Sequence, residues 1–399
     1  MKMGNKYAIV VVGYNRKKGL ERVLQSVSMA DYCGDRVDLI ISLDYCGNAE
    51  IESIARKFIW NYGEKSVKTH SERLGLKKHI LECGRYLKQY DAIVVLEDDV
   101  IVASGFYNYM RQAVEQYESD EHIAGISLYN HSRNILCGLA FTPEYCGKDT
   151  YFLQVAQSWG QIWMRHQWAE FEAWMEENGC KGITNTLVPK FVRGWPDSSW
   201  LKYHIQYCIE TNKFFVYPYY SFCTCYSEQG EHTNEKSALL QVAMNMCKER
   251  QKFRFSAFGK DTVRYDAFFE RMDMERKVGV PDNELCVDIY GMKENHEGKR
   301  YLLSIRQYPY KIVKSYGMSL RPHENNVIYQ EEGEDIFLYD RNQDKDNKKV
   351  NREIERLEYY RVSTVSNAKE FRHVIRKIVR NRVGNVLRGR RSGVKRDKE

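Results

Sequence analysis

The stretch AIVVLEDDV, which runs from Ala92 to Val100, decides the fold of this chain. Its first five residues are apolar, and a short continuous apolar run is typical of a strand that is buried on both faces of a parallel sheet. Three acids, Glu97, Asp98 and Asp99, follow this run at once. The stretch therefore predicts an internal strand that ends in a dense group of carboxylates.

Upstream of this stretch, strand and helix patterns alternate. The strands are predicted at Tyr7–Val12, Val37–Leu43 and Val67–His70, and the helices at Leu20–Val27, Ile51–Ile59 and Leu76–Leu87. Because the crossovers between parallel strands are right-handed, the helices should cover both faces of a mostly parallel sheet. This order predicts a Rossmann-like, doubly wound α/β fold, whose ligands lie beyond the carboxyl ends of the strands.

The second half of the chain is less regular. A strand is predicted at Ile123–Tyr129, and a helix begins near His166. Residues 253–340 contain short mixed segments that the pattern does not assign. The charged stretch Arg341–Asn351 predicts a linker, and Arg352–Leu387 predicts a basic helix.

The positive charge of the chain is concentrated at its end. The 399 residues carry a formal net charge of +7, but residues 371–399 alone hold 11 Lys or Arg and 2 acids. A nucleic-acid-binding surface over the core is therefore not indicated. The eleven cysteines are scattered, which predicts free thiols. No secretory leader or apolar segment of ~20 residues is evident, so we expect a cytoplasmic protein.

The acidic group after the central strand points to a cation. Neighbouring carboxylates repel one another and raise one another's pKa, and a divalent ion relieves that cost. Mg²⁺ and Mn²⁺ prefer oxygen ligands and commonly bind through one or two carboxylates while substrate phosphates complete the shell. Asp99, with Asp98 beside it, is thus a candidate ligand of a metal-diphosphate. The alternative is a solvated turn whose acids cap a helix that starts near Ser104–Phe106.

Other polar residues also follow the predicted strands. Arg16 comes after the first strand, Asp44 after the second and His70 after the third. An acid in the place of Asp44 can bind a ribose or a base, or it can form an Asx-type turn with Tyr45–Gly47. His70 is a candidate ligand-binding residue, although a lone histidine is more often structural.

A general base is predicted in the segment Trp195–Trp200, where two tryptophans flank Asp197. A carboxylate can accept the proton of an attacking hydroxyl, and aromatic side chains suit the face of a sugar. In the alternative interpretation, Asp197 caps a helix at Trp200–Ile209.

In their order along the chain, these motifs resemble the GT-A fold glycosyltransferases, especially the family 2-like enzymes related to N-acetylglucosaminyltransferase I. The resemblance covers about residues 5–250. It rests on VVVGYNR (Val10–Arg16), ISLD (Ile41–Asp44), HSERLGL (His70–Leu76), VVLEDDV (Val94–Val100), SWGQIW (Ser158–Trp163), the acid at Trp195–Trp200 and GEHT (Gly230–Thr233).

The resemblance implies roles for the residues at the strand ends. Arg16, Asp44 and His70 would contact the nucleotide. Glu97 and Asp98 would contact the nucleotide-sugar, as the matching residues of the family do.

The resemblance also implies a metal ligand, a base and one further contact. Asp99 would bind a divalent cation, Mn²⁺ or Mg²⁺. In related enzymes the base is an acid directly before a tryptophan, whereas here Ser199 stands in that place and Asp197 lies two residues earlier. His232, in the Gly-x-His-Thr element, would lie near the acceptor or the diphosphate.

The implied activity is an inverting transfer of a sugar from a nucleotide-sugar to a hydroxyl of a glycan or a lipid-linked acceptor, in surface polysaccharide synthesis. UDP-sugars, and UDP-GlcNAc among them, are favoured because Asp44 and His70 resemble uracil-side positions. The corresponding domains are a catalytic domain at 1–252, with a nucleotide-binding half at 1–130 and an acceptor half at 131–252, an extension at 253–340, and a linker with a basic tail at 341–399.

Two other classes of protein remain as alternatives. One is a nucleotidyltransferase that forms sugar-nucleotides, although the segment Gly13–Gly19 is poorer in glycine than the first loop of such enzymes. The other is a non-catalytic nucleotide- or glycan-binding protein, which the serine at position 199 makes conceivable.

The basic tail has a pattern of its own. In residues 371–399, apolar residues recur at helical spacing among Arg and Lys. This pattern is typical of a helix on an anionic membrane surface, which would place the protein peripherally on the inner face of a membrane. The alternatives are a terminal helix packed on the core with a solvated face and a disordered tail that binds nucleic acid without specificity.

Overall fold

The computed structural model describes residues 6–179, 181–226, 238–259, 262–347 and 353–360, together with Arg372, Arg376 and Val379. The chain divides into two units, Met1–Arg352 and Glu353–Glu399. In the second unit the structure describes α10 (Glu353–Tyr360). The basic tail predicted at 371–399 lies outside the described residues apart from the three single positions, so its membrane role stays a prediction.

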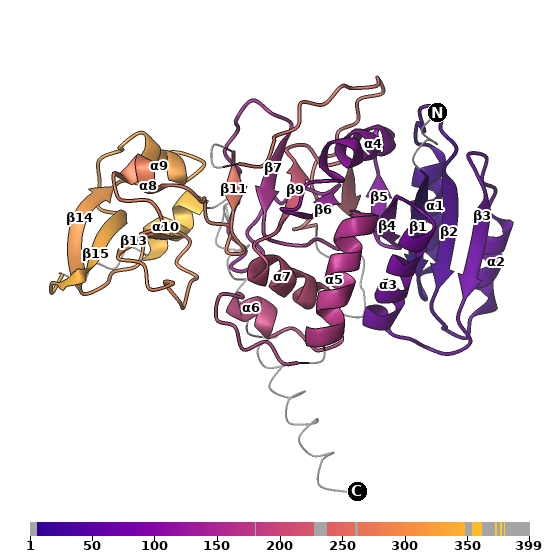
Figure 1. The fold of residues 1–399 in the computed structure, drawn as a ribbon, viewed down its shortest axis with the longest axis horizontal. Helices are drawn as coiled ribbons and strands as arrows, with labels where there is room; N and C mark the ends of the chain where they lie inside the picture. Colours follow the sequence, from indigo (N-terminus) through magenta and orange to yellow (C-terminus); the bar gives the residue numbers. More distant parts are fainter. Residues whose placement is uncertain are drawn as a thin grey trace, which may run out of the picture. The chain divides into compact units, whose positions relative to one another are not determined.

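The first unit is built on a nine-stranded sheet of described residues, with the strand order β11-β7-β9-β6-β8-β4-β1-β2-β3 (Figure 1). Its strands are β1 (Tyr7–Gly13), β2 (Asp38–Leu43), β3 (Lys65–Thr69), β4 (Ala92–Glu97), β6 (Ile123–Ser127), β7 (Thr150–Leu153), β8 (Gln161–Met164), β9 (Phe214–Pro218) and β11 (Arg264–Tyr265). The predicted central strand, β4, lies next to β1 in the middle of this order.

The directions of the strands define one edge of the sheet. β1, β2, β3 and β4 are parallel to one another, as predicted. β8 is antiparallel to both β4 and β6, and β6 is parallel to β9. Strands β4, β6 and β9 therefore run the same way, and their carboxyl ends meet one edge. The prediction of a mostly parallel α/β sheet is confirmed, and β7, β8 and β11 are the strands that run in the opposite direction.

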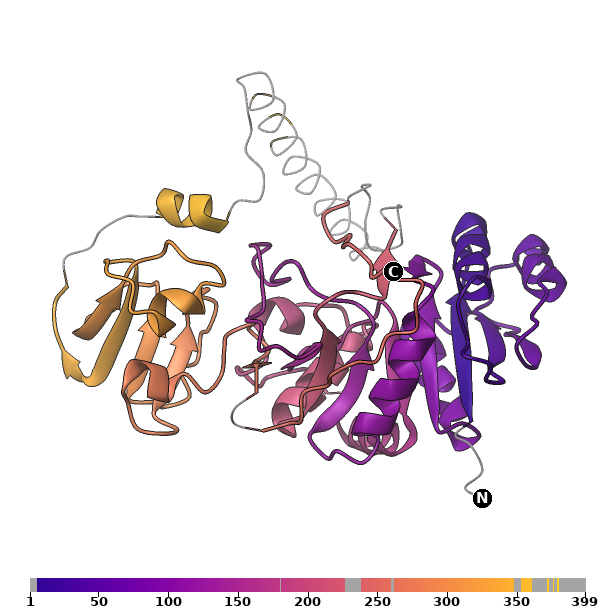
Figure 2. The ribbon, with the colours of Figure 1, turned by 90° about the horizontal axis from the view of Figure 1, so that it is seen from above.

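Helices cover both faces of the sheet (Figures 1 and 2). On one face, α1 (Lys17–Ser28), α2 (Ala49–Lys57) and α4 (Phe106–Tyr117) contribute to a single apolar core with alternate strand residues. The other face carries α3 (Leu76–Gly84), α5 (Arg165–Asn178) and α7 (Leu201–Glu210). There Trp168 of α5 stacks on Trp163 of β8, with 4.0 Å between ring centroids. The prediction of a doubly wound sheet is confirmed, because helices lie on both faces. Successive side chains of a strand point to opposite faces, so one strand can pack against both layers.

Residues after position 252 form a structure that the sequence pattern did not assign. Phe253, Phe255 and Phe258 pack against the core of the central sheet, so the predicted boundary at 252 falls within a segment that belongs to it. A four-stranded sheet follows, in the order β12-β13-β15-β14. Its elements are α8 (Glu275–Val278), β12 (Leu285–Asp288), β13 (Tyr301–Ser304), β14 (Tyr310–Tyr316), α9 (Glu324–Ile328) and β15 (Ile336–Asp344).

The linker predicted at Arg341–Asn351 is wrong for its first residues. The strand β15 extends to Asp344 and pairs with β14 as far as the Tyr310–Asp344 pair. Polar residues are tolerated there because the end of the strand is exposed. The described helices include none with both the length and the apolar character that crossing a bilayer requires. The ten cysteines within the described residues are free thiols, as predicted.

Buried charges join the four-stranded sheet to the core. Glu270 and Asp288 are fully buried, and Lys293 forms an ion pair of 2.5 Å with Asp266. Glu324 of α9 accepts a hydrogen bond from the hydroxyl of Tyr265 in β11. Burial raises the pKa values of Glu270, Asp288 and Glu324. For Glu270, the neighbouring acids raise the pKa further.

The size of this effect is clearest for two of the carboxyl groups. Desolvation raises the pKa of Glu324 to about 7 and that of Asp288 to about 6. His323, next to Glu324, is kept neutral because burial lowers its pKa. At neutral pH the junction therefore holds protons that the unfolded chain would release.

We expect the free energy of unfolding to fall as the pH rises from about 5 to about 8, because the folded state binds the proton of Glu324 more tightly than the unfolded chain does. Glu324→Gln should reduce this fall, since an amide keeps the oxygen that accepts from Tyr265 and does not titrate. Chemical denaturation at a series of pH values measures it. Glu332→Gln, at an exposed position, is the control and should follow the unmodified protein. Equal pH dependence for both variants would contradict the prediction.

Candidate active site

The acidic group lies where β4 ends. Glu97 is the last residue of the strand, Asp98 and Asp99 form a turn, and β5 (Val100–Val102) begins directly afterwards. This arrangement follows from the sequence, because the apolar run ends at Leu96 and two aspartates favour a turn. The carboxylates thus lie at the edge where ligands of such sheets bind.

Arg16 closes over the acidic turn from the neighbouring strand. It follows β1, which is paired with β4, and its position is the N-cap of α1. One guanidinium nitrogen donates a hydrogen bond to Asp98 Oδ1, and the other lies 3.4 Å from Asp99 Oδ2. Asp98 is 5% exposed and also accepts the backbone N–H of Tyr14. The loop after β1 and the turn after β4 therefore form one structure.

The electrostatics of this turn favour a further positive charge. Burial, then Asp99 and Asp98, raise the pKa of the Glu97 carboxyl well above its ordinary value. Burial also raises the pKa of Asp98, although Arg16 opposes it. Three acids face one guanidinium, so the turn keeps an excess of negative charge that a divalent cation would relieve.

The residues present fit such an ion. Carboxylate oxygens are the hard ligands that Mg²⁺ and Mn²⁺ prefer. Within the described residues, however, no group of three or more His, Cys, Asp or Glu side chains is arranged to hold a metal. A cation at Asp99 would therefore take most of its ligands from phosphate oxygens and water, as Mg²⁺ commonly does.

The capping alternative for the acids is not what the structure describes. The helix α4 begins at Phe106 with Gly105 as its N-cap, and in the described chain that cap makes no side-chain hydrogen bond. The strand β5 separates the acids from this helix, and it pairs with β10 (Cys223–Cys225). The backbone carbonyl of Asp99 accepts the N–H of Tyr226, just after β10.

The first turn of α1 packs tightly against the acidic turn. A Cβ atom added at Gly19 would lie 2.3 Å from the backbone carbonyl oxygen of Asp98. Since this neighbour is backbone, it cannot move aside without displacing the turn. Glycine at position 19 therefore permits the close approach of α1 to the acids.

We expect Gly19→Ala to destabilise the protein and to disturb the acidic turn. In a helix without this contact, the same change would stabilise by about 1 kcal/mol, so the sign of the effect is diagnostic. Thermal unfolding measures it. Gly182→Ala, at a position with open space around it, is the control. A Gly19→Ala protein with a higher melting temperature would refute the close contact.

Asp44 joins two loops at the same edge. It is 6% exposed and lies at the end of β2. Its carboxylate accepts the backbone N–H groups of Tyr45, Leu74 and Gly75 at distances of 2.8 to 3.0 Å. Asp44 therefore holds the loop that follows β3 in addition to its own turn. Its predicted contact with the nucleotide stays a prediction.

His70 begins that loop. Its Nε2 is 3.9 Å from Glu82 Oε2, and its ring packs edge-on against His79, with 5.2 Å between centroids. The guanidinium of Arg73, in the same loop, lies 4.8 Å from the ring centroid of Tyr14. The structure thus brings the loops after β1, β2, β3 and β4 together, as the predicted sheet required.

Sequence reasoning missed several residues of this site. His79 is buried, its ring nitrogen lies 2.8 Å from Ser42 Oγ, and burial lowers its pKa to about 4. Its place on the apolar face of the predicted helix was a signal for it. Tyr14 and Arg73 gave no such signal, because their contact depends on how two distant loops meet.

Asp197 is exposed and paired with a buried lysine. Its side chain is 84% exposed, whereas Lys202 is 2% exposed and places its Nζ 2.5 Å from Asp197 Oδ1. The hydrogen bond and the charge of Lys202 lower the pKa of Asp197, and Lys77 of α3 lowers it further. The Nζ of Lys77 lies 4.0 Å from the ring centroid of Tyr203, whose hydroxyl lies 3.5 Å from Asp197 Oδ1. Asp197 therefore lies near the first turn of α3, which follows the loop that His70 begins.

The helix-cap alternative for Asp197 is not found either. The N-cap of α7 is Trp200, and within the described residues its side chain makes no capping hydrogen bond. His232, the remaining predicted site residue, belongs to residues 227–237, which lie outside the described part of the chain.

No known protein family and no curated protein match this chain. Among solved structures, it is similar to TarS from S. aureus in complex with UDP-GlcNAc, at a TM-score of 0.36 and 14% identity over 57% of this chain and 60% of that one. It is also similar to the mannosyltransferase PcManGT from Pyrobaculum calidifontis in complex with GDP-Man and Mn²⁺, at a TM-score of 0.32 and 11% identity over 54% and 57% of the two chains.

A third similar structure is GalNAc-T7 with UDP, GalNAc and Mn²⁺, at a TM-score of 0.36 and 12% identity over 54% of this chain and 42% of that one. In each case the likeness spans less than two thirds of the other chain. Likenesses at these TM-scores support no conclusion about function. The function is therefore argued from the residues of this chain.

Proposed function

We propose that this protein is a metal-dependent glycosyltransferase that moves a sugar from a nucleotide-sugar to a hydroxyl group. The observation that carries the proposal is the partly buried acidic turn Glu97–Asp99, which pairs with Arg16 at the carboxyl end of an internal parallel strand. Such a turn combines excess negative charge with a place at the ligand-binding edge. A cation and a diphosphate are the partners that this combination suits.

The donor would lie across the loops after β1, β2 and β4. Arg16 is partly exposed, with 26% of its side chain accessible, so its guanidinium can also donate to a phosphate oxygen while it stays paired with Asp98. Asp44 and His70 would face the nucleotide from the neighbouring strands. A UDP-sugar, and UDP-GlcNAc in particular, is our proposed donor on the basis of the motif resemblance.

The chemistry at the donor is the stabilisation of a leaving group. A bound divalent cation would act as a Lewis acid on the diphosphate as negative charge develops there. Asp99 would hold this ion, while Asp98 keeps Arg16 beside it. Arg16 adds a second positive charge on the side of the leaving group.

The acceptor hydroxyl needs a group that removes its proton. Lys202 and Lys77 lower the pKa of Asp197, so this carboxylate is ionised at neutral pH, and its exposure leaves it open to an acceptor. A base with a lowered pKa is weaker, but it is always in the form that accepts a proton. We propose Asp197 as the base of an inverting displacement, with a glycan or a lipid-linked glycan as the acceptor.

We expect Asp99→Ala to abolish the Mn²⁺-dependent binding of UDP-sugars, because the turn would lose the carboxylate assigned to the ion. Titration of UDP-GlcNAc and other nucleotide-sugars with and without Mn²⁺, followed by calorimetry, measures it. Asp282→Ala is the control. This residue is exposed, lies between α8 and β12, and its variant should bind the donor normally. Unchanged donor affinity in Asp99→Ala would defeat the site assignment.

We expect Asp197→Asn to lower the rate of sugar transfer by roughly 10²–10⁴-fold while donor affinity stays the same, because only the proton transfer is lost. Mn²⁺-dependent hydrolysis of the donor provides an assay that needs no known acceptor. Retained hydrolysis with retained donor binding in this variant would show that another group is the base. Hydrolysis by the unmodified protein would also argue against a non-catalytic binding protein.

A further inference from the structure

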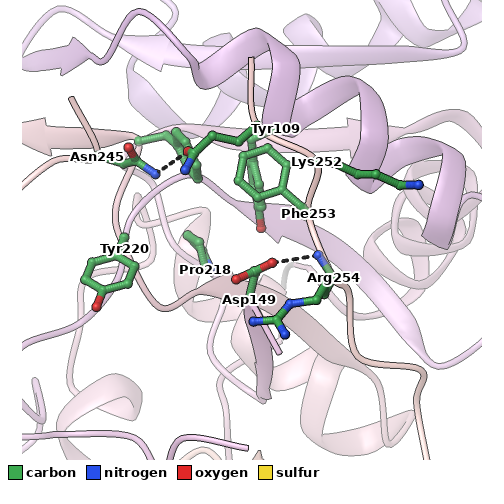
Figure 3. Close-up of a pocket in the computed structure, with 10 residues that line it drawn as sticks. Tyr109, Asp149, Pro218, Tyr220, Asn245, Lys252, Phe253 and Arg254 are labelled. Atoms are coloured by element: carbon green, nitrogen blue, oxygen red, sulfur yellow. Dashed lines mark hydrogen bonds between the residues drawn. The ribbon is translucent and has the colours of Figure 1, made fainter. Parts of the chain in front are cut away.

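A hollow in the protein surface lies apart from the acidic turn. It has a volume of about 250 Å³ and is open to solvent. Figure 3 shows Tyr220 and Lys252 on opposite sides of this hollow, with Asp149 and Arg254 between them. None of these residues belongs to the site described above.

The hollow lies on the same edge of the sheet as the acidic turn. Pro218, in its wall, is the last residue of β9, which runs in the same direction as β4. Asp149 directly precedes β7, whose first residue, Thr150, pairs with Pro218. Two strands, β6 and β8, separate β9 from β4. Three strand spacings place the two sites roughly 14 Å apart along the sheet.

The backbone connects the two places. Tyr226, whose N–H is bonded to the carbonyl of Asp99, follows β10 directly. The segment that reaches the hollow is tied to β10, because Val242 N–H donates to Thr224 Oγ1 at 3.0 Å. Three residues later, the N–H of Asn245 donates to the carbonyl of Ser221 at 2.7 Å. The strand β10 and its flanking residues are therefore hydrogen-bonded both to the acidic turn and to the segment that lines the hollow.

The walls of the hollow combine an aromatic ring with fixed polar groups. Tyr220 is 73% exposed, although large aromatic side chains usually bury more of their surface. Asn245 donates to the side-chain oxygen of Gln251 at 2.8 Å, and Asp149 accepts the backbone N–H of Arg254 at 2.6 Å. These bonds hold an amide pair and a carboxylate in place before any ligand binds, which reduces the cost of binding.

One of the residues that line the hollow has a buried hydroxyl without a hydrogen-bond partner in the described part of the chain. This residue, Tyr109 of α4, is fully buried. Its ring stacks on Phe222, with 4.5 Å between centroids. Burial, and after it Tyr117 and Asp149, raise the pKa of this hydroxyl. A buried donor of this kind is costly unless another polar group meets it.

A saccharide fits these walls better than an anion does. Sugar rings have an apolar face that packs on aromatic rings, and their hydroxyl groups both donate and accept hydrogen bonds, so amides and carboxylates can bind them. A phosphate would find Lys252 and Arg254 but would be repelled by Asp149. In Figure 3 the ammonium group of Lys252 also points away from Asp149.

We propose that this hollow is a second saccharide-binding subsite, in which Tyr220 stacks on a sugar unit of an extended glycan acceptor while its reacting end lies at the acidic turn. This inference deepens the proposed glycosyltransferase function and rests on it for the role of the bound glycan. The subsite selects for acceptor length, because a single sugar unit cannot reach both places.

The experiment measures saccharide binding in the absence of nucleotide and metal, so that it is independent of the donor site. The probes are N-acetylglucosamine, its β-1,4-linked tetramer, maltotetraose and inorganic phosphate, and saturation-transfer NMR reports which of them bind to the full chain. At least one tetrasaccharide should bind, and more tightly than N-acetylglucosamine does. Tyr220→Ala should weaken this binding by about tenfold, the loss expected for a central aromatic contact.

A matched control separates this effect from a general loss of tyrosine. Tyr329, at the end of α9, is 72% exposed, almost the same as Tyr220. Tyr329→Ala should bind the tetrasaccharide as the unmodified protein does. Tyr109→Phe removes only the buried hydroxyl and leaves the ring stacking intact. It therefore tests separately whether this hydroxyl contributes to saccharide binding.

The outcomes are distinct from those for the donor site. Absence of saturable binding to every saccharide, equal weakening in Tyr220→Ala and Tyr329→Ala, or binding of phosphate alone would overturn the subsite. Saccharide binding that depends on Tyr220 supports it even if Asp99→Ala leaves donor affinity unchanged, and in that case only the donor-site assignment fails.

Discussion

The structure depends on three adjacent acids at the end of an internal strand, of which Asp98 is buried and Glu97 and Asp99 are partly buried. Burial raises the pKa of Glu97 and Asp98, and the cost is offset by the guanidinium of Arg16 and the N–H of Tyr14. The close approach of α1 at Gly19 keeps this turn in place. These contacts join the loop after β1 to the turn after β4. The same contacts therefore stabilise the acids and fix the two central strands relative to each other.

This one constraint organises the rest of the edge. Asp44 uses its carboxylate to fix the loop after β3, and Arg73 in that loop packs on Tyr14. The acidic turn continues into β5, which pairs with β10, and Thr224 of β10 accepts a hydrogen bond from the segment that continues to the hollow beside Tyr220. Because the acidic turn and the hollow lie at one edge of the sheet, one extended glycan could contact both.

Much of this architecture was predictable from local pattern. The apolar run at Ala92–Leu96 and the alternation around it predicted β1 to β4, their directions and the edge where ligands bind, because a buried parallel strand needs apolar residues on both faces. The four-stranded sheet was not predictable. Where it joins the core, acids such as Glu270 and Asp288 are buried at positions that a pattern assigns to the surface.

The sequence by itself determined the order of elements from β1 to β4 and the place of Asp99 and its neighbours, since both follow from residues that are adjacent in the chain. Only the tertiary structure decided that Arg16 covers the acids, that Lys202 pairs with Asp197, and that Asp149 and Tyr220 share a hollow. The physical reason is distance along the chain. Hydrogen bonds and charge pairs act over a few ångströms, and the partners that meet there come from separate loops whose positions are set by the packing of the whole sheet.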